Sequence, residues 1–173
     1  IAKNEAEKKE ITNAVIEQKR IQYKDMGAFD IFCHQGVEDF YHSLPLEQSH
    51  LSAIKLKNEI VATHLGNHHS GRYYYLLPAY KKGMWSKFSI GRLLLEELLK
   101  WSHENNIIEF DFSIGAEAYK KDWCDTSQDL HSFVSYHTPK GFLYHLGFKL
   151  KMILSNNRYF SSLKNMVKKR LFN

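Results

Sequence analysis

One stretch of the sequence combines residue types that suit a phosphate-binding site. A predicted strand over 72–79 runs into a basic loop that contains a glycine, and a predicted helix follows from Ser89. The first turn of a helix offers unpaired backbone N–H groups and the positive end of the helix dipole, which favour a phosphate or pyrophosphate. The candidate phosphate-binding residues are Lys87, Phe88, Ser89, Ile90, Gly91 and Arg92. A capped helix without a ligand is the alternative that so short a motif leaves open.

Asp111 and His64 are the candidate general bases. Asp111 lies in a predicted strand between Phe110 and Phe112, where a carboxylate is costly to bury without a function. If both phenylalanines face the core, the alternation of a strand places Asp111 toward solvent instead. His64 has a side chain that titrates near neutral pH, but it is one of ten histidines in the chain.

The remaining histidines and the cysteines carry little signal for metal binding. His68 and His69 are adjacent, so an extended chain points them apart, and no Cys-x-x-Cys pattern accompanies them. Cys33 and Cys124 have no local signature of a nucleophile and are expected to be structural thiols. We therefore expect no metal cofactor.

The hydrophobic periodicity predicts an α/β (α+β) fold that would position these residues. Helical spacing predicts helices over 3–26, about 36–44, 89–104 and most of the chain from 142 onward. Alternation predicts strands over 51–57, 60–65, 72–79, 107–112 and 131–137. Three consecutive strands with short turns make an antiparallel meander, and a crossover helix then brings strand 107–112 in parallel. We expect a mixed, mostly antiparallel central sheet flanked by helices.

Length and composition place the chain among ordinary globular domains. Its 173 residues suit one domain, with a helical part at 1–48, a sheet-and-crossover core at 50–137 and a basic helical tail at 142–173. Two cysteines exclude a disulfide framework, and there is neither an apolar run of membrane-spanning length nor a signal peptide. These features predict a cytoplasmic protein.

The net charge of +5 is unevenly distributed along the chain. Residues 130–173 hold eight of the 24 Lys and Arg residues and none of the 19 Asp and Glu residues. An apolar stripe with lysines beside it, over 159–172, gives this tail the composition of an interfacial or partner-binding helix. We expect an anionic partner or a membrane surface there, and a solvated helix face is the alternative.

Five short segments resemble the GNAT acetyltransferase superfamily. They are, in chain order, 60–62, 71–75, 79–80, 88–96 and 110–120. Their order is similar to the CelD-like/FemABX-related branch, which is often found in polysaccharide biosynthesis and has the pattern Asp-Phe-x-x-Gly-x-x-x-Tyr-Lys. The resemblance covers 50–123 well and 10–50 loosely. The chain departs from the branch at Ile90, where a proline is usual.

The resemblance implies an acyl-CoA co-substrate, acetyl-CoA first, with its pyrophosphate at 87–92 and its pantetheine arm between strands 72–79 and 107–113. Tyr119 matches the position of a tyrosine that protonates the departing thiolate in GNAT enzymes, and a packed aromatic residue is its structural alternative. Lys120 is expected to hold a phosphate or to polarise the carbonyl, or to be an ordinary surface lysine. Because the branch has two such lobes and this chain begins with isoleucine, we expect it to be the C-terminal lobe of a longer protein.

The function expected from the resemblance is N- or O-acyl transfer from acyl-CoA to a sugar or a polysaccharide or cell-envelope precursor. One alternative is a FemX-like transferase that uses aminoacyl-tRNA, whose phosphates would suit the basic tail. Another is a non-catalytic lobe that binds an acceptor or a partner protein. A nucleic-acid-binding module is disfavoured because no base-reading motif is present. The oligomeric state is left open.

Overall fold

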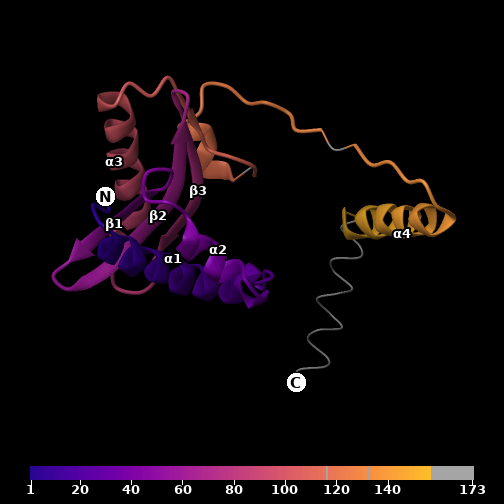
Figure 1. Ribbon diagram of the computed structural model, residues 1–173, viewed down its shortest axis with the longest axis horizontal. Coiled ribbons are helices and arrows are strands. Elements are labelled where there is room, and N and C mark those ends of the chain that lie inside the picture. The colour runs from indigo at the N-terminus through magenta and orange to yellow at the C-terminus, as the bar shows by residue number, and fades with distance from the viewer. Residues whose placement is uncertain (116, 132, 157–173) are drawn as a thin grey trace. The chain divides into compact units, whose positions relative to one another are not determined.

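The computed structural model describes residues 1–115, 117–131 and 133–156 (Figure 1). The chain divides into two compact units, Ile1–Cys124 and Asp125–Asn173, and each is described by itself. The expectation of a single domain that forms the C-terminal lobe of a longer protein stays a prediction.

The first unit alternates helices with a small sheet. Its α-helices are α1 (Glu5–Met26), α2 (Val37–Ser43) and α3 (Ile90–Glu104). Its strands are β1 (His50–Leu56), β2 (Glu59–His69), β3 (Arg72–Tyr80) and β4 (Glu109–Asp111). Short 3-10 turns occur at η1 (Ile31–Cys33), η2 (Ser86–Phe88) and η3 (Ala118–Asp122). The helices and strands predicted between residues 3 and 112 are all present.

The sheet has the order β1-β2-β3-β4. The first two pairings are antiparallel, and the pairing of β3 with β4 is parallel, as the crossover through α3 requires. The predicted mixed, mostly antiparallel sheet flanked by helices is therefore confirmed. One difference is the length of β2, which extends to His69 through residues predicted to form a turn.

Helices cover both faces of the sheet, and each face has its own apolar core. On one face, Leu94, Leu95 and Leu98 of α3 pack with Val61 and Tyr73 of the sheet. On the other face, side chains of α1 pack on the sheet; the buried members of this second cluster are Ile11, Val15, Leu51 and Leu65. The crossover helix is thus anchored along its length, which fixes the position of its first turn relative to β3.

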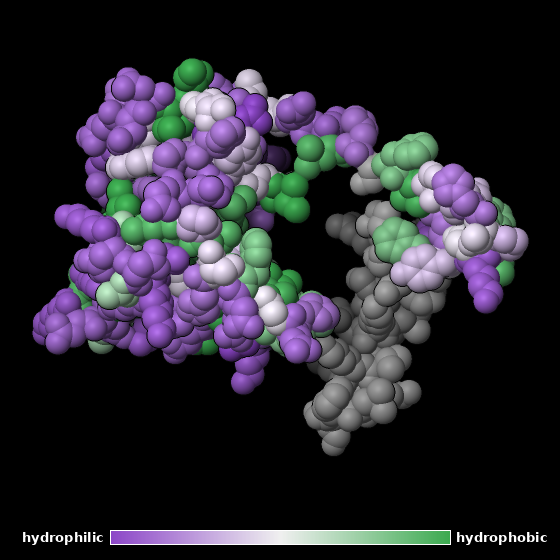
Figure 2. All heavy atoms as spheres, in the orientation of Figure 1, coloured by the Kyte–Doolittle hydropathy of each residue, from purple (hydrophilic) through white to green (hydrophobic). Residues whose placement is uncertain are grey.

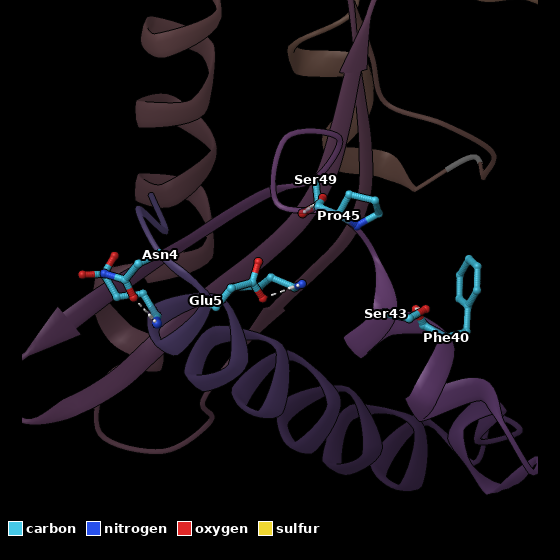
Figure 3. Close-up of polar contacts among 8 residues, drawn as sticks. Asn4, Glu5, Phe40, Ser43, Pro45 and Ser49 are labelled. Carbon is cyan, nitrogen blue, oxygen red and sulfur yellow. Dashed lines mark hydrogen bonds and ion pairs between the residues drawn. The ribbon is translucent and has the colours of Figure 1, made fainter.

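The ends of α1 show why this long helix begins and ends where the sequence predicts. The side chain of Asn4 accepts a hydrogen bond of 2.9 Å from the backbone N–H of Glu7, satisfying a donor in the first turn (Figure 3). Gly27 adopts a left-handed conformation at the other end, with φ of 62°.

Ser49 closes the turn before β1 by donating its hydroxyl to the carbonyl of Pro45 at 2.9 Å (Figure 3).

The second unit contains α4 (Pro139–Asn156), which confirms the helix predicted there. The strand predicted over 131–137 is wrong, because its described residues have no regular structure. Alternation makes a strand only where a neighbouring strand supplies hydrogen bonds, and the exposed side chains of Phe133, Val134 and Tyr136 show no such support. The apolar stripe expected over 159–172 lies outside the described residues. Within residues 1–115, 117–131 and 133–156, no helix has the length and apolar character to cross a bilayer.

Candidate functional site

Strands β3 and β4 pair over three residues and then separate. Arg72, Tyr73 and Tyr74 pair with Glu109, Phe110 and Asp111, and β3 continues to Tyr80 without β4 beside it. At the same place the register of β3 against β2 shifts, so that Leu65 faces Leu77 but Gly66 faces Tyr75. Leu76 is therefore an extra residue, a β-bulge, at the point of divergence. Such a bulge leaves backbone groups outside the ladder and available to a ligand.

The start of α3 lies beyond the far end of β3. Ser89 occupies the N-cap position, but it has a left-handed backbone with φ of 51°, and its side chain makes no capping hydrogen bond. Ser89 is therefore the N-cap residue without being a side-chain cap, since the usual capping residue has an extended backbone. Within the described part of the chain, the backbone N–H groups of Ile90 and Gly91 donate no hydrogen bond. They form a donor pair suited to an anion.

The other residues predicted to bind phosphate surround this turn. Lys87 is exposed, with its ammonium 5.0 Å from the ring centre of Phe88. Arg92 is paired with Glu96 at 3.1 Å and lies over the ring of Trp123. A Cβ at Gly91 would approach the ring of Tyr80 to 3.1 Å, so this glycine makes room for a side chain of β3. A variant of Gly91 would disturb that contact, and Lys87 is the better position for a binding test.

Tyr75 of β3 and Tyr119 of η3 are near enough to interact electrostatically. Tyr119 lies in η3 and is 40% exposed. Tyr75 lies in β3, packs against Phe112 with ring centres 5.6 Å apart, and is almost completely buried. Burial raises the pKa of Tyr75, and the neighbouring Tyr119 raises it further. Burial and then Glu117 also raise the pKa of Tyr119, so both phenols keep their protons at neutral pH.

Lys120 is engaged by its own chain. Its ammonium donates to the carbonyl of Ile114 at 3.0 Å and to those of Ser113 and Gly115 at 3.5 Å. It also forms an ion pair with Glu117 at 2.8 Å, and its side chain is only 11% exposed. This lysine therefore holds the loop after β4 in place, and the two roles that the resemblance implies for it stay predictions.

Asp111 ends β4 with its side chain partly exposed. One carboxylate oxygen accepts the backbone N–H of Ser113 at 2.7 Å, and the other lies 3.8 Å from the guanidinium of Arg72. The strand alternation thus leaves Asp111 neither buried among the phenylalanines nor free in solvent. It orients the turn that leads away from the divergence toward η3.

His64 is in the protein interior. Its ring is stacked on Tyr75 with centres 4.5 Å apart, and its Nδ1 lies 3.2 Å from the hydroxyl of Tyr73. The same hydroxyl lies 2.6 Å from Nδ1 of His50. Burial, followed by the nearby His50 and Lys19, lowers the pKa of His64 well below its usual value. A base has to reach the proton that it removes, and the zero exposure of His64 counts against that role.

The hydroxyl of Tyr73 determines the proton positions in this cluster of His50, Tyr73 and His64. A phenol has one proton, so it donates to one imidazole and accepts from the other. One histidine is therefore protonated at Nδ1 and the other at Nε2. Both Nε2 atoms are buried and have no hydrogen-bond partner among the described residues. No sequence motif indicates this cluster, although the alternation of a strand places Tyr73 and Tyr75 on one face.

Proteins with α/β folds bind phosphate-bearing ligands at the N-terminus of a helix and at the carboxyl ends of parallel strands, and this chain has both features together. The family model described as the acetyltransferase (GNAT) domain matches residues 3–121. The chain belongs to this family, which confirms the superfamily inferred from the sequence motifs. No curated protein and no solved structure matches the chain.

The family implies acyl transfer as the general chemistry of the chain. Among residues 1–115, 117–131 and 133–156, no group of three or more His, Cys, Asp or Glu side chains is arranged to hold a metal ion. The CelD-like branch, the identity of the acyl donor and the roles of the individual site residues stay predictions.

Proposed function

We propose that the chain is an acyl-CoA-dependent N- or O-acyltransferase that uses acetyl-CoA and acts on a sugar or on a polysaccharide or cell-envelope precursor. The divergence of β3 and β4 at the Leu76 bulge carries this proposal. The resemblance implies that the pantetheine arm of the ligand lies between these two strands. The acceptor class follows from the resemblance to the CelD-like branch.

The start of α3 and the bulge at Leu76 suit different parts of acetyl-CoA. At the start of α3, the N–H groups of Ile90 and Gly91 and the positive dipole end favour the pyrophosphate, and Lys87 adds a positive charge. At the bulge, backbone donors that lie outside the ladder suit the thioester carbonyl, whose oxygen gains negative charge during attack.

The residues at the divergence support direct transfer. The acceptor amine or hydroxyl attacks the thioester carbon, the C–S bond breaks, and the thiolate takes a proton from a neighbouring acid. Tyr119 is that acid, because its raised pKa keeps the phenol protonated and its side chain is partly exposed. Asp111 is the candidate to receive the proton of the acceptor, since it lies at the end of β4 and keeps a partly exposed carboxylate.

Acetyl-CoA is expected to stabilise the chain, and Lys87→Glu is expected to weaken binding about tenfold, as for the loss of one charge-assisted phosphate contact. Ligand that binds only the folded state raises the melting temperature, so a thermal titration with acetyl-CoA measures both quantities. Lys100→Glu is the matched control, because it makes the same charge change at an exposed lysine near the other end of α3.

Absence of a thermal shift at saturating acetyl-CoA would contradict the proposal. A shift with aminoacyl-tRNA in its place would favour the FemX-like alternative, and no shift with either would favour a non-catalytic lobe. Equal effects of Lys87→Glu and Lys100→Glu on binding would show that the pyrophosphate does not bind at the start of α3.

Tyr119→Phe is expected to lower kcat roughly 100-fold and to leave acetyl-CoA binding unchanged, because the variant loses only the proton for the thiolate. Release of the CoA thiol, followed with a panel of amino sugars as acceptors, measures the rate. Tyr136→Phe is the control, since Tyr136 has a similar exposure and lies in the other unit. An unchanged kcat in Tyr119→Phe would show that another group protonates the thiolate.

A further inference from the structure

Within the second unit, helix α4 carries an apolar stripe. Leu143, Leu146 and Leu150 follow one another at spacings of three and four residues, which places them on one side of the helix. All three are about half exposed. Phe142 lies four residues before Leu146 and adds an exposed aromatic ring to the same side of the helix. Figure 2 shows hydrophobic and hydrophilic residues together on the visible face of α4. An exposed apolar stripe of this kind marks an interaction surface.

The charge around this stripe has a single sign. Lys140 and Lys149 are exposed on α4. The sequence from 130 to 173 has eight Lys and Arg residues and no Asp or Glu, whereas the preceding residues contain all 19 acids of the chain. A helix that packs in an uncharged groove of another protein would not require residues 130–173 to lack Asp and Glu. The charge therefore specifies an anionic partner.

We propose that α4 binds an anionic phospholipid bilayer and lies in the plane of its surface. The leucine stripe enters the boundary between head groups and acyl chains, the ring of Phe142 lies beside it on the same side of the helix, and the flanking lysines contact the lipid phosphates. An acidic protein would satisfy the charges, but the combination of leucines, aromatic rings and lysines on one helix matches a bilayer interface better. The inference does not depend on the proposed acyl transfer.

Co-sedimentation of the full chain with vesicles tests this proposal. We expect the chain to sediment with phosphatidylcholine vesicles that contain phosphatidylserine, and not with phosphatidylcholine alone. Raising the salt concentration should release it, because screening weakens the attraction of the lysines for the lipid surface.

Two variants separate the apolar from the charged contribution. Leu146→Gln should weaken vesicle binding about tenfold, since one leucine no longer enters the lipid. Ile21→Gln is its control, because Ile21 is a helical aliphatic residue with 47% exposure, close to the 45% of Leu146. Lys149→Glu should also weaken binding about tenfold, and Lys100→Glu on α3 should not.

Four outcomes would overturn the proposal. They are no sedimentation with phosphatidylserine vesicles, equal sedimentation with neutral vesicles, equal effects of the α4 variants and their controls, and binding to heparin or RNA without binding to vesicles. The last result would show that the partner of α4 is a soluble polyanion and not a bilayer. Circular dichroism confirms that each variant is folded.

Discussion

The free energy of unfolding is expected to fall steeply as the pH is lowered from 6.5 toward 4, well before the carboxylates of the protein are protonated. The cause is the buried cluster of His50, Tyr73 and His64. Burial lowers the pKa of His50 from 6.5 to about 4, with smaller contributions from the amino group of Ile1 and then from His68. Burial also lowers the pKa of His64. Both imidazoles are neutral in the folded chain, whereas both take up protons in the unfolded chain below pH 6.5.

The direction of the effect follows from this difference in bound protons. The unfolded state binds more protons between the two pKa values, so stability is complete above pH 6.5 and decreases toward the folded pKa. For His50 the loss reaches about 3 kcal/mol, because each tenfold difference in proton affinity between the two states corresponds to roughly 1.4 kcal/mol. Glu59 and Glu117 have lowered pKa values because of their bonds with Lys81 and Lys120, and they affect stability only below about 4.5.

Urea denaturation at several pH values between 7.5 and 4.5 measures this loss. His50→Asn retains a polar atom near the position of Nδ1 but cannot titrate, so its stability should depend less on pH even if it is lower at pH 7. His69→Asn is the control, because His69 is exposed at the end of β2. An unchanged slope in His50→Asn would show that the cluster does not cause the acid sensitivity.

Gly66→Ala is expected to destabilise the fold by about 3 kcal/mol, at the upper end of the usual cost of overpacking. A Cβ at this position would lie 2.5 Å from Cε1 of His64 and 2.6 Å from the backbone carbonyl of Tyr74. The carbonyl belongs to the strand and cannot rotate away, and His64 is held between Tyr73 and Tyr75. The added methyl group must therefore displace either the sheet or the histidine cluster.

Chemical denaturation of Gly66→Ala gives this cost directly. Gly147→Ala is the matched control, because a Cβ there meets nothing within 4 Å and lies in a helix, where alanine is favoured over glycine. Stability equal to that of the unchanged chain in Gly66→Ala would mean that β2 and β3 are not packed as closely as the structure shows.

The order of the elements in the first unit could be predicted from the sequence, because each carries its own local signal. Gly27 ends α1, the Lys57–Asn58 turn separates β1 from β2, and the spacing of leucines in α3 is clearly helical. The strand expected at 131–137 is absent because alternation is a local property, whereas a strand depends on a partner elsewhere in the chain.

The candidate site was only partly predictable for the same reason. The helix start at Ser89 is visible in the sequence, but its left-handed backbone is not, and a serine at this position normally predicts a side-chain cap. The bulge at Leu76 arises from the register of two strands, which no short motif encodes. The surroundings of Lys120 and His64 could not be predicted, because burial and loop contacts decide them.

The short pairing of β3 with β4 also bears on how the site is entered. Three residue pairs on one edge hold β4, whereas β2 forms seven residue pairs with β1 and eight with β3. Opening β4 therefore breaks fewer backbone hydrogen bonds than separating β2 from its neighbours, but it also has to expose Phe112, which is buried in the core beside α3. A ligand that inserts between β3 and β4 would oppose this opening, so the backbone amides of β4 are expected to exchange their hydrogens more slowly when the ligand binds.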